Sequence, residues 1–332
     1  MQSYEKFLKT NKIQKKAHFF WSIFCDLWVI MEKLRYNLAL VVSNILFGIS
    51  FSVYVSLLQG AMNSMQLFSL QLLFSLFVFA PLALPQRGFF RLSLNDFGSI
   101  FIVALLVVFG WWYMLMMGAS YTNPIDASTI ATVGPVFTLI TSIVAQSRRA
   151  KRGEIIGVII TLLGAFVLLF DRGLSLIGEG GEGYGNALVL CAVVAIAVNT
   201  VFITPVLRRH GVVVVMGWYY IIGSIIALPL LVAEIPTLKM FDFTHLQYAE
   251  IGYILLFGSV LPMCLLYVGS EHLTPLHTAV YRYIQPVVAT IVALVRGQAI
   301  IDRTNIIGAV LIFCGMLCVI ISTPRDGTTT RG

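Results

Sequence analysis

The chain has 332 residues, of which 58% are hydrophobic and only 11% are charged, and its mean hydropathy is +0.90. Soluble domains carry about a quarter charged residues, so this composition excludes a water-soluble globular protein and indicates a chain embedded in a bilayer. The net charge of +7 does not indicate a nucleic-acid partner, because the basic residues fall in short loops and near the termini.

Residues 1–35 form a basic N-terminal segment ahead of the first predicted membrane helix. The stretch 18–30 is apolar but short and contains Asp26, and no small-residue cleavage site of a signal peptide precedes the first helix. We expect either an interfacial helix, with its lysines near anionic headgroups, or a translation start at Met31 that leaves this segment out of the mature protein.

Ten apolar segments follow, and nearly all reach the length of about 20 residues that a membrane helix needs. The connections between them are short, so neighbouring helices are predicted to pack antiparallel. The Gly-rich loop 171–184 is a predicted linker between two halves, 36–170 and 185–322, and residues 323–332 form a predicted cytoplasmic tail. The helices are predicted at 36–57, 64–84, 98–118, 124–145, 154–170, 185–207, 212–233, 250–270, 275–295 and 304–322.

The two halves repeat each other at an offset of 151 residues, without a gap. The shared residues are mostly Gly and Pro, which fix backbone geometry. Five helices in a half is an odd number, so the second half enters the membrane from the opposite side. We therefore expect an all-α polytopic membrane protein with ten transmembrane helices, arranged as two inverted five-helix repeats around a central cavity. The aligned pairs are Gly60 with Gly211, Gly118 with Gly269, Pro124 with Pro275, Pro135 with Pro286, Arg152 with Arg303, Gly157 with Gly308 and Gly164 with Gly315.

The distribution of Lys and Arg predicts the orientation of the chain. Seventeen of the 22 basic residues fall in the termini and in the loops on one side of the ten-helix arrangement, and four fall in the loops on the other side. Cytoplasmic loops carry the excess of positive charge. Both termini are therefore predicted to lie in the cytoplasm, in a multi-pass protein of the inner (cell) membrane.

The fourth and ninth predicted helices are repeat partners and carry the most polar residues. Each opens with a proline and carries a second one eleven residues later, about 16 Å along the axis and so near mid-membrane. Pro135 and Pro286 therefore predict helix kinks, and freed backbone groups at this depth are tolerated best where they line a cavity. The alternative is a pair of packing kinks without contact to a ligand.

Arg282 is the most deeply placed charge of the chain, about 10 Å from the start of the ninth helix. A guanidinium at this depth predicts a substrate carboxylate or phosphate as its partner. The alternative is a structural role, in which Arg282 binds kink carbonyls or Asp126. His277, Tyr281 and Gln285 follow one another at a spacing of four residues and share a face of the same helix.

Asp126 and His277 are repeat partners, each two residues after the opening proline of its helix. They are predicted to act as gate residues at opposite ends of the bundle, or as groups that titrate in proton coupling. For Asp126 the alternative is a capping role, because a carboxylate in the first helical turn is favoured by the helix dipole.

Three further residues are candidates for lining the cavity. Asn44 and Asn199 are interior polar residues, for which hydrogen bonding between helices is the alternative. Trp112 could stack on a ligand or belong to an interfacial aromatic belt. Small residues on one face of the fifth and of the tenth helix predict close helix packing, within the bundle or between protomers; these are Gly157, Gly164, Gly308 and Gly315.

No motif for an enzyme or a metal site is present. The five cysteines fall in apolar stretches without a CxxC pair, and the sequence lacks GxSxG, HExxH and a Walker loop. The interpretation is a protein that is not an enzyme and that has no cofactor and no metal.

The combined pattern resembles the EamA-type transporters of the drug/metabolite transporter superfamily. The matching segments are NPIDASTIATVGPVFTLITSIVA and TPLHTAVYRYIQPVVATIVAL, each followed by a Gly-x6-Gly helix, and the likeness covers about residues 36–322. Phe47 stands where the family commonly has Trp, and Gln298 stands where a second Glu is expected. The resemblance implies substrate-binding residues on several helices, here Asn44, Trp112, Thr132, Asn199, Tyr281, Arg282 and Gln285.

The function expected from this resemblance is export of small organic metabolites, such as amino acids or related compounds, by alternating access of the two halves. Within transport, Arg282 keeps a nucleotide-sugar or phosphate-ester exchanger as an alternative. From another class, a membrane sensor or scaffold without turnover stays open. The partners expected are a small-molecule substrate and the lipid bilayer, with a homodimer as an open arrangement.

Overall fold

The computed structural model describes residues 34–86, 88–145, 151–171, 181–234, 237, 243–298 and 303–322. These residues are helical apart from short connections, and no strand occurs among them, which confirms the all-α class. Eight helical rods in this part of the chain are long and apolar enough to cross a membrane. Most of the expected N-terminal segment, most of the linker 171–184 and the whole tail 323–332 lie outside the described residues.

The helices start and end within a few residues of their predicted bounds. The largest difference is at the eighth segment, which begins at His245 because Thr244 caps its first turn through a capping box with Gln247. The uninterrupted rods are Leu34–Gly60, α2 (Ser64–Ala83), α7 (Arg152–Asp171), α8 (Glu182–His210), α9 (Val212–Glu234) and α14 (Arg303–Ser322).

Four rods are interrupted, and the interruptions occur in corresponding helices of the two halves. The third and eighth rods contain π-helical segments, which place successive side chains at other angles than an α-helix does. The third rod is α3 (Leu94–Leu105), η1 (Leu106–Tyr113) and α4 (Met114–Ala119), and the eighth is α10 (His245–Tyr253), η4 (Ile254–Val260) and α11 (Leu261–His272).

The fourth and ninth rods are interrupted just before their inner prolines. Proline cannot donate a hydrogen bond to the carbonyl four residues earlier, so the backbone ahead of it tightens. Val133 N–H donates to the carbonyl of Ile130, three residues back, and a 3₁₀ turn precedes Pro286. The fourth rod is therefore α5 (Pro124–Ala131) and α6 (Gly134–Ala145), and the ninth is α12 (Pro275–Val280), η5 (Tyr281–Tyr283) and α13 (Ile284–Val295).

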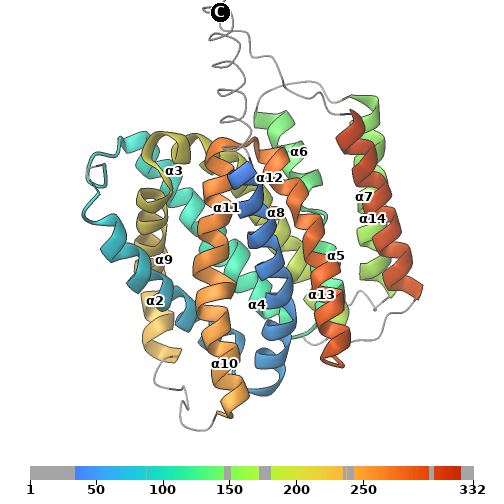
Figure 1. Ribbon diagram of the computed structural model, residues 1–332, viewed down its shortest axis with the longest axis horizontal. Coiled ribbons are helices and arrows are strands. Elements are labelled where there is room, and N and C mark those ends of the chain that lie inside the picture. Colours follow the sequence, from blue (N-terminus) through green and yellow to red (C-terminus); the bar gives the residue numbers. More distant parts are fainter. Residues whose placement is uncertain are drawn as a thin grey trace, which may run out of the picture.

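Figure 1 shows the helices as a bundle, with α2 and α9 at one edge and the pair of α7 and α14 at the other. The first rod, α8 and α11 lie between these edges. The largest fully buried side chains include four tyrosines, Tyr54, Tyr219, Tyr220 and Tyr267. Large apolar side chains such as Phe77, Ile225 and Ile321 are exposed instead, as expected where lipid is the solvent.

The pair of α7 and α14 depends on the four glycines that the sequence marks for packing. A Cβ at Gly157 would lie 2.5 Å from the carbonyl oxygen of Gly315, and one at Gly164 would lie 2.9 Å from the carbonyl oxygen of Gly308. The backbones of these helices are therefore in direct contact, as small residues permit in membranes. Any larger side chain at these sites must push the two helices apart.

We expect Gly157→Leu to destabilise the protein, because its side chain would collide with backbone atoms that cannot rotate away. Overpacking of this kind costs roughly 1–3 kcal/mol or more. The measurement is the apparent melting temperature of the full chain in detergent. Gly252→Leu is the matched control, since a Cβ at this helical glycine would meet no atom within 4 Å. An equal loss in both variants would contradict the packing role.

Candidate functional site

A small cavity lies at the centre of the bundle, among five of the helical rods. Its free space admits about one water molecule, which is too little for a metabolite. We call it the central cavity. It combines one charged group, two amides and an apolar wall. The residues that line it are Asn44, Phe47, Trp111, Ile196, Met263, Leu266, Arg282 and Gln285.

Arg282 supplies the charge of the central cavity. Only 4% of its surface is exposed, and its guanidinium carbon lies 5.7 Å from the ring centre of Trp111, in cation–π geometry. The described residues form no ion pair or hydrogen bond with this guanidinium. Gly134 makes room for it, because a Cβ there would lie 3.2 Å from Arg282 Cδ. A buried cation thus faces the cavity without an anionic partner among these residues.

A chain of hydrogen bonds fixes the two amides beside Arg282. Asn44 Nδ2 donates to the carbonyl of Leu40 at 2.7 Å, so Asn44 Oδ1 must face Gln285. Gln285 Nε2 donates to this oxygen at 2.7 Å, which leaves Gln285 Oε1 without a partner in the described part of the chain. Because the first acceptor is a backbone carbonyl, neither amide can be flipped without losing a bond. The cavity therefore presents an open acceptor next to a cation.

The structure gathers only part of the predicted substrate-binding set at the central cavity. Asn44, Arg282 and Gln285 line it, whereas Trp112 faces a second cavity on the other side of the same helix. Asn199 lies nearby and donates to the hydroxyl of Tyr267 at 3.3 Å, with its own Oδ1 unpaired among the described residues.

Thr132 and Tyr281 lie away from the central cavity. Thr132 is fully buried, and its hydroxyl donates to the carbonyl of Thr129 in the helix break. The hydroxyl of Tyr281 donates to Asn37 Oδ1 at 2.9 Å, and His277 contacts the same oxygen at 3.3 Å. His277 is exposed. Through their shared contact with Asn37, His277 and Tyr281 connect the start of the ninth rod to the start of the first rod.

Asp126 is fully buried at the start of α5 and connects three helices. Its carboxylate accepts hydrogen bonds from Asn186 on α8, at 3.3 Å, and from Asn305 on α14. Its backbone N–H is capped by Asn123 Oδ1 at 2.9 Å. Asp126 therefore connects α5 of the first half with α8 and α14 of the second half, at the end of the bundle where α5 begins.

The substrate-binding residues that the resemblance implies include Trp112 but not Trp111, Phe47 or the rest of the apolar wall of the central cavity. The adjacent pair Trp111 and Trp112 was visible, but the choice between them depends on the π-helical segment η1. Phe47 lies 6.5 Å, between ring centres, from both Trp111 and Trp112. Its helical spacing from Asn44 was the available signal, since residues three apart share a helix face.

Metal chemistry finds no support in the described residues, because they contain no group of three or more His, Cys, Asp or Glu side chains able to hold an ion. In the described part of the chain, Cys191 and Cys314 are free, exposed cysteines. The chemistry of the central cavity is therefore that of recognition, by one guanidinium, one amide oxygen and aromatic rings.

The sequence profile of the EamA-like transporter family matches residues 34–170 and 183–321. An uncharacterized transporter of Archaeoglobus fulgidus is 26% identical over 148 residues, so the match spans 45% of this chain and about half (51%) of that protein. An uncharacterized transporter of Clostridium kluyveri is 25% identical over 273 residues, covering 78% of this chain and 84% of that protein. A solved crystal structure of another protein shares the fold, with a TM-score of 0.58 at 17% identity, over 86% of this chain and 98% of that one. Because the family profile matches both halves, the chain belongs to the EamA-like transporter family.

Proposed function

We propose that this membrane transporter exports small zwitterionic metabolites, amino acids or related compounds, through the central cavity. The observation that carries the proposal is Arg282, a buried guanidinium that faces the cavity without an anionic partner among the described residues. A buried charge is costly unless it is paired, so a carboxylate brought by the substrate is the partner that fits.

The ammonium group of a zwitterion also has a matching group in the central cavity. Gln285 Oε1 is an unpaired acceptor beside Arg282, and an ammonium group is a donor that can satisfy it. The wall of Phe47, Trp111 and Ile196 suits the apolar part of a small metabolite. The combination of cation, acceptor and apolar wall is complementary to an amino acid.

The alternative of a nucleotide-sugar or phosphate-ester exchanger is less well matched by the charge of the cavity. Arg282 is the one cation among the residues that line it, whereas a diphosphate carries more than one negative charge. A non-transporting scaffold would use Arg282 as an internal ion-pair partner, and the described residues provide none. Both alternatives therefore rank below a zwitterion carrier.

The transport mechanism that we propose is alternating access of two inverted five-helix repeats, with ten membrane helices in all. The proposal is supported by the helix breaks before Pro135 and Pro286 and by the π-helical segments, which occur in corresponding rods of the two halves. The distribution of the basic residues supports a cytoplasmic location of both termini in an inner-membrane protein, and the proposed direction of export rests on the family resemblance.

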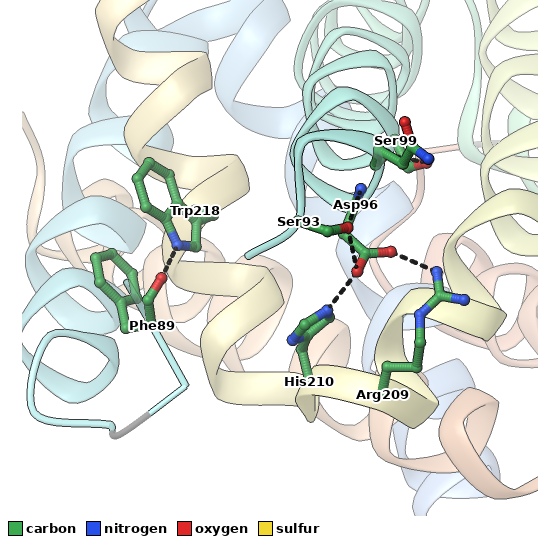
Figure 2. Close-up of polar contacts among 8 residues, drawn as sticks. Phe89, Ser93, Asp96, Ser99, Arg209, His210 and Trp218 are labelled. Atoms are coloured by element: carbon green, nitrogen blue, oxygen red, sulfur yellow. Dashed lines mark hydrogen bonds and ion pairs between the residues drawn. The ribbon is translucent and has the colours of Figure 1, made fainter. Parts of the chain in front are cut away.

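Polar contacts between the halves close both ends of the bundle. At one end, Asp96 at the start of α3 binds His210, at 2.9 Å, and Arg209, both at the end of α8 (Figure 2). At the other end, Ser56 of the first rod contacts Glu250 and Arg296, which form an ion pair. Opening either end must break its contacts while the other end stays closed, which is the requirement of alternating access.

Replacing Arg282 by methionine tests the proposed function, because it removes the charge and keeps most of the volume. In proteoliposomes, we expect Arg282→Met to lower amino-acid counterflow at least about tenfold, since a charge-assisted contact contributes roughly 1.5–3 kcal/mol. Arg282→Lys should retain part of the activity, because it keeps the charge but loses the bidentate geometry.

The same variant separates transport from a structural role through its stability. Arg282→Met should leave the apparent melting temperature of the ligand-free protein unchanged or raise it, because it removes a buried cation without an internal anionic partner. A clear fall in melting temperature and folded yield, with unchanged specific activity per folded molecule, would favour the scaffold.

Arg296→Met is the matched substitution at an arginine with an internal partner. It leaves Glu250, only 6% exposed, without its cation, so we expect a lower melting temperature in detergent. The loss should stay below the roughly 3–5 kcal/mol typical of a fully buried pair, because Arg296 is 25% exposed. The additional change Glu250→Gln should recover part of it. Unchanged stability in Arg296→Met would contradict the contribution of this pair to closing the bundle.

A further inference from the structure

A second cavity lies between α2 and α9, next to the central cavity. We call it the α2–α9 cavity. Its walls come from helices of both halves, and its free space again admits about one water molecule. Phe68, Leu72 and Met116 form its apolar wall, and its polar lining includes Gln71, Ser75, Trp112 and Tyr220.

Four buried polar atoms at this cavity lack a hydrogen bond of normal geometry within the described residues. They are Gln71 Oε1, Ser75 Oγ, Trp112 Nε1 and the hydroxyl of Tyr220. The hydroxyl of Tyr220 lies close to the hydroxyls of Tyr219 and Ser75 without forming such a bond. Native proteins pair the large majority of their buried polar atoms, so four exceptions around one cavity point to a missing partner.

The orientation of Gln71 is set by its other contacts. Its Nε2 donates to the hydroxyl of Tyr54 at 2.9 Å and approaches the carbonyl of Ile254 at 3.5 Å. A backbone carbonyl cannot donate, so the amide nitrogen must face Ile254 and the amide oxygen stays open. The cavity therefore offers one fixed acceptor in Gln71, one fixed donor in Trp112 and two hydroxyls that can act as either.

The group that fits this lining is uncharged. No Asp, Glu, Lys, Arg or His is among the residues that line the α2–α9 cavity, so an ion there would have no counter-charge. A primary amide, which both donates and accepts, satisfies Gln71 and Trp112 together. A hydroxyl group can do the same with fewer bonds.

The α2–α9 cavity and the central cavity adjoin at the tryptophan pair. Trp111 lines the central cavity, Trp112 lines the other, and Phe47 contacts both rings. On the second side of this wall, Tyr220 packs on Tyr219 with 4.1 Å between ring centres, and Tyr219 packs on Tyr267 at 6.1 Å.

We infer that the α2–α9 cavity is a subsite for an uncharged, hydrogen-bonding group of the transported molecule, so that the preferred substrates are amino acids with an amide or hydroxyl side chain. This inference rests on the proposed function, because the carboxylate end of the same molecule binds Arg282. Each cavity is too small for an amino acid, so the side chains of Phe47 and Trp112 between them must move when substrate enters. Gln71, Trp112 and Tyr220 then determine which side chain is accepted.

The test compares glutamine, glutamate and methionine, which are similar in size, as ligands of the full-length protein in detergent. We expect glutamine to bind at least about tenfold more tightly than the other two, since buried polar groups that lose their partner reject the analogue that lacks it. Gln71→Met and Tyr220→Phe should reduce this preference. Tyr283→Phe is the matched control, because Tyr283 also has a buried, unpaired hydroxyl among the described residues but does not line the cavity.

The outcomes separate this inference from the proposed function. Equal binding of the three amino acids, all dependent on Arg282, would overturn the subsite and leave the proposed function standing. A preference that Tyr283→Phe lowers as much as Tyr220→Phe, or that neither variant changes, would overturn it too, and an ordered water would then satisfy the four polar atoms. No binding of any amino acid would remove both proposals.

Discussion

The constraint on which this structure depends is that a bilayer offers no hydrogen bonds to the backbone. A membrane helix can be interrupted only where protein surrounds the break or where it lines a cavity. The breaks before Pro135 and Pro286 obey this rule, since Ala131, Thr132 and Arg282 are all buried. The 3₁₀ turn at residues 281–283 carries Arg282 toward the central cavity. The proline that weakens the helix therefore also places the charge.

A guanidinium at this depth has an energetic cost that the described residues do not offset with an anion. Insertion of a charged side chain at the centre of a membrane helix costs about 2.5–3.5 kcal/mol, even when the surroundings adapt. The ring of Trp111 returns part of this through its cation–π contact, about 0.5–2 kcal/mol. The remainder is free energy that a carboxylate can recover on binding. The unpaired charge of Arg282 therefore favours the binding of an anion in the central cavity.

The helices and some of the residues at the central cavity could be predicted from the sequence. The other residues at the cavity could not, because their positions depend on local backbone geometry. The lengths of the apolar segments give the rods within a few residues, because a membrane helix needs about 20 apolar residues in a row. Depth along the ninth helix drew attention to Arg282, and the four-residue spacing drew attention to Gln285; both line the central cavity. The family resemblance pointed to Trp112 on the third helix, whereas Trp111, its neighbour in the π-helical segment η1, is the tryptophan that lines the central cavity. Tyr281 turned out to contact Asn37, because the tight turn after it separates its surroundings from those of Gln285.

The two ends of the bundle are closed by different chemistry, and this difference bears on how the halves can move. At the α3–α8 end Arg209 is more than half exposed, so solvent screens its ion pair with Asp96, whereas the side chains of His210 and Asp96 are only 14% and 12% exposed. At the other end Glu250 and Asp126 are buried, and each binds helices of the opposite half. Breaking those contacts leaves the carboxylates of Glu250 and Asp126 without their partners, which is costly unless water hydrates them. The ion pair of Arg209 is therefore the contact that solvent weakens most, whereas the Asp96–His210 pair and the contacts of Glu250 and Asp126 need a new partner or water before the halves can separate.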